Sequence, residues 1–183
     1  SNLAMAKLLQ SYYPLYDHTN DPGALVSDSN ATYVIPEKRG QVTINLGSWS
    51  PVFAVAIETP KAADAQGRCE SVEARWFSVY VHLVGAEMAA CRTNVDPKGP
   101  AEDEGWCLVG SFEYRCENKP ALQVFCLDVV PKVAREPQQW TSSGSAACWT
   151  GKGWHTHRLR IVLKDNWGAP ATRVRRLRVL TFP

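Results

Sequence analysis

The chain has 183 residues, a net charge of +2 and a hydrophobic fraction of 45%. This length suits one domain with long loops, and it can bury a core without needing cross-links. The near-neutral charge gives no strong general field for nucleic acid or an acidic membrane. The sequence holds no apolar run near the roughly 20 residues of a membrane span and no visible signal peptide. We therefore expect an excised domain whose anchor or targeting segment lies elsewhere.

The first segment, residues 3–13, is the one good helix candidate. Leu8, Leu9 and Tyr12 recur at helical spacing, and Pro14 ends the segment because proline disfavours a helical residue before it. A polar loop rich in turn-forming residues follows. Within it, Asn30 begins the triplet N-x-[ST], which makes it a candidate glycosylation site.

Strand patterns dominate the remaining chain. Two of the runs flank residues 117–120, which read as a hairpin turn, and the last two are separated by a turn-like segment at 165–170. We expect the last strand to pair with residues 158–163 or lie beside them, and Trp167 to be at least partly buried in the turn before it. About seven strands with turns between them predict a single all-β domain, residues 1–183, folded as an antiparallel β-sandwich with a short N-terminal helix. The predicted strands are residues 41–46, 52–57, 76–84, 107–115, 121–127, 158–163 and 174–180.

Two long insertions, residues 85–105 and 130–153, interrupt the strand pattern. The first is polar and ends in an acidic run, and the second is rich in Pro, Gln, Ser and Gly. Long loops without structure of their own are usually functional or disordered in a compact domain. Both insertions are therefore candidate surfaces.

Six cysteines permit disulfides without requiring them. No C-x-x-C spacing is present, which argues against structural zinc. Free buried thiols and at least one disulfide both remain open, because the redox compartment decides between them. The hairpin register predicts that Cys116 and Cys126 are not bonded to each other, and that Cys69, Cys91 and Cys148 are the better candidates for any disulfide.

Enzymatic chemistry is not supported by any motif. The sequence contains no G-x-S-x-G elbow, no H-E-x-x-H and no phosphate-binding glycine loop. Cys148, His155 and His157 are more simply read as polar residues near a strand than as a metal cluster. The acidic run at 102–104 lacks the ligand spacing of a calcium loop. We expect a domain without catalytic residues or a bound metal.

Arginines gather near the C-terminus, which raises the possibility of nucleic-acid binding. Residues two apart on a strand share a face, so Arg176 and Arg178 point one way while Arg173 and Arg175 point the other. The charge is spread over two faces rather than collected in one stripe. With a net charge of only +2, a solvated face with one or two buried ion pairs is the better interpretation.

The C-terminal motifs resemble those that close a SUN domain. Residues 159–161 (LRI), 166–170 (NWGAP) and 176–179 (RLRV) follow the family's order. Upstream, PLYDH at 14–18 and LVGSFEY at 108–114 resemble further family motifs. The likeness covers most of the chain, with the two insertions added.

The resemblance implies a galactose-binding or discoidin-like jelly roll that forms a trimer through an upstream coiled coil. Such a domain would lie at the nuclear envelope, in the perinuclear or endoplasmic-reticulum lumen. It would bind the C-terminal tail of a KASH-like peptide from an outer-membrane protein, linking nucleus to cytoskeleton. The loop from Asp21 to Asn30 would be the place for a monovalent cation.

The same resemblance suggests the residues of a peptide site. Arg175 and Glu58 stand where the family has a tyrosine and a histidine that hold the terminal carboxylate, and the turn residues Asn166, Trp167 and Gly168 lie in the matching motif. Glu58 would repel a carboxylate, whereas Arg175 could attract one or pair with Glu58. An altered binding mode is therefore expected. The family's disulfide joins a cysteine of a Cys-Trp dipeptide to a second cysteine, and Thr32-Tyr33 and Arg173 stand at those positions, so both partners are missing.

The alternative hypothesis is a discoidin-like module that binds glycans. Exposed tryptophans could stack on sugar rings, and the candidates are Trp49, Trp140, Trp149 and Trp154. Ordinary core or loop packing is the simpler interpretation for each of them.

Overall fold

The computed structural model describes residues 33–59, 68–71, 73–85, 88, 91, 105–116, 121–127, 148 and 153–181, and the backbone of residues 7–9. These residues form nine β-strands, and every pairing between strands is antiparallel. The prediction of an all-β antiparallel fold is therefore confirmed. The strands are β1 (Lys7–Leu9), β2 (Tyr33–Ile35), β3 (Gly40–Glu58), β4 (Ala74–His82), β5 (Trp106–Glu113), β6 (Leu122–Cys126), β7 (Trp154–Asn166), β8 (Thr172–Val174) and β9 (Arg176–Thr181).

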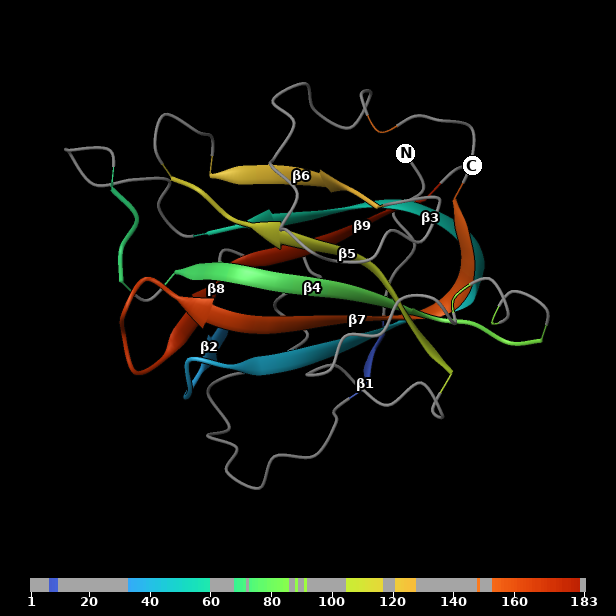
Figure 1. The fold of residues 1–183 in the computed structure, drawn as a ribbon, viewed down its shortest axis with the longest axis horizontal. Helices are drawn as coiled ribbons and strands as arrows, with labels where there is room; N and C mark the ends of the chain where they lie inside the picture. The colour runs from blue at the N-terminus through green and yellow to red at the C-terminus, as the bar shows by residue number, and fades with distance from the viewer. Residues whose placement is uncertain are drawn as a thin grey trace.

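The long strand β3 takes part in both layers of the fold (Figure 1). Its first half lies in a sheet of order β1-β3-β7-β4-β5, and its second half pairs with β6 and β9. The register of β3 against β7 shifts between Asn45 and Ser50, where Gly47 adopts a φ of 76°. A left-handed φ is cheap for glycine because it has no Cβ, so this position allows the strand to bulge and turn from one layer into the other.

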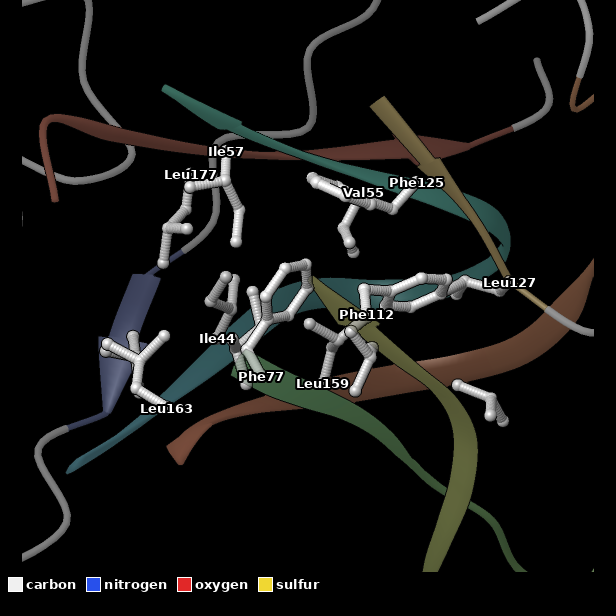
Figure 2. Close-up of a cluster of buried hydrophobic side chains, with 14 of the residues drawn as sticks. Ile44, Val55, Ile57, Phe77, Phe112, Phe125, Leu127, Leu159, Leu163 and Leu177 are labelled. Carbon is white, nitrogen blue, oxygen red and sulfur yellow. The ribbon is translucent and has the colours of Figure 1, made fainter. Parts of the chain in front are cut away.

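Aromatic and aliphatic side chains from the two layers meet between them (Figure 2). Phe77 of β4 and Phe112 of β5 contact Phe125 of β6, with ring centroids 4.8 Å and 5.3 Å apart. Along β7, Leu159, Ile161 and Leu163 are buried at every second position, as expected for a strand with one face in the core. The alternation that predicted these strands reports this buried face.

Three disulfides are present. Cys69 is bonded to Cys116, Cys91 to Cys107, and Cys126 to Cys148. Cys116 and Cys126 are not bonded to each other, as predicted, and each of the three favoured cysteines is a member of a disulfide. The stated reason was wrong, however, because it rested on a β5–β6 hairpin. The two strands pair with β4 and β3 respectively and lie in different layers.

Two further expectations about strands are corrected. The closing strand β9 pairs with residues 52–58 of β3 and not with β7, because β3 is long enough to serve β7 with its first half and β9 with its second. Residues 7–9 of the predicted helix form strand β1, which pairs with residues 43–45 of β3. Pairing with the edge of the sheet satisfies the backbone hydrogen bonds of this segment. A helix this short is only marginally stable by itself, so the strand is favoured. The rest of segment 3–13 lies outside the described residues.

The described residues contain no helix that is both long and apolar enough to cross a membrane.

Candidate functional site

A row of polar and aromatic side chains crosses the sheet of order β1-β3-β7-β4-β5, on the face opposite Leu159, Ile161 and Leu163. Asn45 of β3 lies opposite Arg158 of β7, and His82 of β4 lies opposite Trp106 of β5. Arg158 and His82 join the two pairs, since Nη2 of the arginine is 2.9 Å from Nε2 of the histidine. Residues more than a hundred positions apart in sequence therefore form one continuous row.

A local irregularity in β7 adds His157 to this row. The hydroxyl of buried Thr156 accepts a hydrogen bond from the backbone N–H of Arg158 at 3.2 Å and lies 2.8 Å from the carbonyl oxygen of His82. The ring of His157 is consequently near that of His82, with centroids 5.4 Å apart. The side chains of His82, His157 and Arg158 are thus held close together, where β7 begins beside the end of β4.

The bulge in β3 adds an exposed tryptophan. Asn45 Oδ1 accepts a hydrogen bond from the N–H of Gly47 at 2.9 Å, which stabilises the turn of the strand. Trp49 then lies beside His157, with ring centroids 4.6 Å apart, and 50% of its surface is exposed. Trp49 is the one aromatic residue among the large hydrophobic residues that are exposed in the described part of the chain.

Two guanidinium groups lie over the buried indole of Trp106. The Cζ atom of Arg160 is 4.1 Å from the ring centroid and that of Arg158 is 5.7 Å away. Arg160 also donates from Nε to Thr43 Oγ1 at 3.2 Å. Cation–π contacts and hydrogen bonds fix both side chains before any ligand arrives. We call Trp49, His82, Trp106, His157, Arg158 and Arg160 the Trp49 patch.

The protonation of His157 matters for what the patch can bind. Loss of solvent on burial, and secondly the positive charge of Arg158, lower the pKa of His157 below its usual range. The ring is therefore neutral near pH 7, with one nitrogen that donates and one that accepts a hydrogen bond. A neutral imidazole beside fixed guanidinium donors suits the recognition of hydroxyl groups.

The Trp49 patch lies where both insertions join the described fold. Strand β4 ends at His82, β5 begins at Trp106, and β7 begins at Trp154. Residues 85–105 connect the first two of these strands, and residues 130–153 lead into the third. The sequence singled out both insertions as candidate surfaces, although most of their residues lie outside the described part of the chain.

The predicted ion pair between Glu58 and Arg175 is present. Arg175 Nη1 lies 3.3 Å from Glu58 Oε1, and Arg176 Nη1 lies 3.3 Å from Oε2. The backbone N–H of Arg175 also donates to the carbonyl oxygen of Glu58 at 2.9 Å. Both carboxylate oxygens are thus already matched by guanidinium groups, which makes this a structural pairing of β3 with the start of β9.

The other predicted site residues form a turn. Asn166 is 3% exposed and donates from Nδ2 to the carbonyl oxygens of Ala169 and Ala171, at 3.0 Å and 2.8 Å. Its Oδ1 accepts from the N–H of Gly168 at 2.9 Å, where φ is 119°. Trp167 is partly buried, as predicted, with the guanidinium of Arg75 4.3 Å above its ring. The side chain of Asn166 is therefore committed to holding this turn.

A second cluster of potential metal ligands, Cys69, Glu73 and Cys116, is occupied by the disulfide between its two cysteines. Cys148 is likewise bonded to Cys126, so its sulfur is not free to form a metal site with the histidines of β7. Asn30 and the loop proposed for a cation lie outside the described residues, as do Trp140 and Trp149. Trp154 is partly buried against the core.

Comparison with known proteins identifies the fold. No family model matches the chain, and no curated protein does. Among solved structures, the family 32 carbohydrate-binding module of Streptococcus pneumoniae EndoD has a TM-score of 0.60 at 14% identity, with 100% of each chain covered. The CBM32 of AlyQ in complex with 4,5-unsaturated mannuronic acid has a TM-score of 0.53 at 12% identity, covering 98% of this chain and 95% of the other.

A third neighbour is the family 32 module of C. perfringens NanJ in complex with galactose. Its TM-score is 0.52 at 11% identity, with 89% of this chain and 86% of the other covered. At these identities the likeness shows a shared fold, the discoidin-like jelly roll. The predicted sandwich class is confirmed by it.

These neighbours overturn the functional interpretation drawn from the SUN resemblance. The neighbours are carbohydrate-binding modules. The prediction of a bridging domain that binds a KASH-like peptide is therefore wrong. The occupied carboxylate of Glu58 and the structural use of Asn166 agree with this correction. Sequence reasoning nevertheless named one residue of the Trp49 patch in its alternative, Trp49 itself. It missed His82, Trp106 and Arg158 as site residues, because only strand pairing brings them together.

Proposed function

We propose that this domain is a non-catalytic carbohydrate-binding module and that sugar binds at the Trp49 patch. The observation that carries the proposal is the half-exposed indole of Trp49 beside His157, next to the Arg158–His82 pair. An aromatic face next to fixed hydrogen-bonding groups is the combination that a sugar ring requires. The fold shared with carbohydrate-binding modules supports the proposal.

Each part of the patch has a distinct task. The indole of Trp49 offers an apolar face on which the C–H groups of a sugar ring can pack. His157 and Arg158 offer donors and an acceptor for hydroxyl groups, with directions set by the bulge at Thr156. Because these side chains are already in place, little conformational entropy is lost on binding.

The described residues of the patch have no arrangement for bond cleavage. Hydrolysis of a glycosidic bond ordinarily needs a pair of carboxyl groups on either side of it. The described face carries arginines, histidines and aromatic residues instead. Binding without turnover is therefore the expected behaviour.

The first test is a glycan array with the wild-type domain, followed by titration of the best ligand against Trp49→Ala and Trp49→Phe. We expect Trp49→Ala to weaken binding by about 10-fold or more, since stacking and burial of an aromatic face are worth about 1–3 kcal/mol, and Trp49→Phe to retain most of it. Leu122→Ala is the control, because Leu122 is another exposed apolar residue, 36% exposed, on β6.

Thermal unfolding of each variant separates a binding defect from a folding defect. The proposal is wrong if no glycan binds, or if Trp49→Ala binds as tightly as the wild type. Release of a cleaved product from the bound glycan would contradict the non-catalytic part alone.

A further inference from the structure

The guanidinium group of Arg158 has no carboxylate partner among the described residues. Its contacts are the imidazole of His82 and the indole of Trp106. Five other described arginines lie against carboxylates. These pairs are Arg75 and Arg115 with Glu113, Arg173 with Glu70, and Arg175 and Arg176 with Glu58.

The neighbouring rows of the same sheet face do not provide a counter-charge either. Next to the row of Arg158 lies the row of Arg160, whose described cross-strand neighbours are Thr43, Tyr80 and Leu108. The row after that holds Gln41, Val162, Ser78 and Ser111. The first carboxylate in this direction along the described strands belongs to Glu113, which Arg75 and Arg115 already hold.

The guanidinium of Arg158 also has an unfilled hydrogen bond. Its Nε atom is buried and has no hydrogen-bond partner among the described residues, as is also the case for Nε of Arg173, Arg175 and Arg176. A donor without an acceptor costs free energy, which favours an acceptor placed against this guanidinium. Carboxylate and sulfate oxygens are strong acceptors for this group, since an arginine can donate two parallel N–H bonds to one anion.

We propose that the glycan bound at the Trp49 patch carries an anionic group, a carboxylate or a sulfate, and that Arg158 recognises it while Trp49 stacks on the sugar ring. This inference rests on the proposed function and specifies the class of its ligand. The ring of Trp49 lies against that of His157, which precedes Arg158 in the chain, so the stacking face and the guanidinium belong to one site. Arg160, fixed over Trp106, adds to the positive potential.

The test compares acidic sugars with their neutral counterparts by calorimetric titration. The probes are oligosaccharides of galacturonate and mannuronate, the matching neutral galactose and mannose oligosaccharides, and galactose 6-sulfate. At least one acidic sugar should bind about 10-fold or more tightly than its neutral counterpart, the difference expected for a charge-assisted pair. The uronates and the sulfate separate the two sources of negative charge.

The variants Arg158→Gln and Arg158→Lys assign the preference to this side chain. Arg158→Gln should weaken binding of the acidic sugar about 10-fold more than that of its neutral counterpart, so that the preference is lost, whereas Arg158→Lys should keep part of the preference. Arg39→Gln is the matched control, because Arg39 is an exposed arginine in the turn before β3. Raising the salt concentration should weaken binding of the acidic sugar more than that of the neutral sugar.

The inference fails separately from the proposed function. If a neutral glycan binds in a Trp49-dependent manner while every acidic sugar binds no better, the domain is a carbohydrate-binding module without acidic preference. An acidic preference that survives Arg158→Gln in a folded variant also overturns the inference. If no sugar of either kind binds, both proposals are wrong.

Discussion

Glu73 is a carboxyl group with no exposed surface, placed against a disulfide. Its Oε2 atom lies 3.0 Å from Sγ of Cys116, and that sulfur carries no proton because it is bonded to Cys69. A proton between the two atoms must therefore come from the carboxyl group. Burial, the largest effect, raises the pKa of Glu73 to about 7. The neutral acid is the form that this environment favours.

This pKa predicts that the contribution of Glu73 to the free energy of unfolding falls as the pH rises. The folded state binds the proton more tightly than the unfolded state, so the contribution of Glu73 is full below about pH 4.5 and declines until about pH 7. The shift corresponds to about 3 kcal/mol. We expect Glu73→Gln, which is always neutral, to gain about this much relative to the wild type between pH 4 and pH 8, as measured by urea unfolding.

The control for this measurement is Glu37→Gln, since Glu37 is exposed in the turn before β3. Comparing each variant with the wild type at both pH values cancels the titration of all other groups. A difference between Glu73→Gln and wild type that stays the same at pH 4 and pH 8 would show that Glu73 ionises alike in both states.

At the level of elements, strand β5 depends on a glycine that makes room for an aromatic ring. Gly110 and Phe112 are two apart on β5 and share a face. A Cβ atom at Gly110 would lie 2.4 Å from Cζ of Phe112, whose ring is 2% exposed and packs against Phe77 and Phe125. The ring cannot retreat without disturbing the contact between the two layers.

We therefore expect Gly110→Ala to destabilise the fold by about 1–3 kcal/mol, the usual cost of overpacking a core. Thermal unfolding gives the change directly. The double variant Gly110→Ala with Phe112→Leu tests the cause, because a smaller side chain at 112 should make the alanine less costly. Equal costs of the alanine in both backgrounds would show that the contact with Phe112 is not responsible.

For the whole molecule, the disulfides tie the sheets to the segments between them. Cys69–Cys116 closes a loop with a sequence separation of 47, and Cys91–Cys107 one of 16. Removing the longer cross-link leaves more conformational freedom in the unfolded chain. The larger loop is therefore expected to contribute more stability.

Replacing both cysteines of a pair by alanine measures this contribution. We expect the loss of Cys69–Cys116 to cost about 1 kcal/mol more than the loss of Cys91–Cys107, in a total of about 3–4 kcal/mol each. Urea unfolding of the two double variants, both fully oxidised elsewhere, provides the comparison. A larger loss from the shorter loop would mean that packing around Cys107, which has no exposed surface, outweighs chain entropy.

The sequence by itself determined the local features of the fold. A run of β-branched and aromatic residues predicted β4, which is buried on both faces over most of its length, and alternation predicted the first half of β3, while turn residues marked the ends of the strands. The loop cysteines were the right candidates for disulfides, since Cys69, Cys91 and Cys148 are each bonded to one of the other three cysteines. Trp49 was one of four tryptophans named as candidates for stacking on a sugar, with ordinary packing as the simpler interpretation.

Tertiary structure alone decided which strands meet. Alternation indicates that one face of a strand is buried, but it does not identify the neighbouring strand. The last strand was therefore expected to pair with β7 or lie beside it, although β9 pairs with the second half of β3. The Trp49 patch has the same origin. His82 and Arg158 become neighbours only because β4 and β7 pair over a long sequence distance, and the bulges at Gly47 and Thr156 then turn Trp49 and His157 toward them.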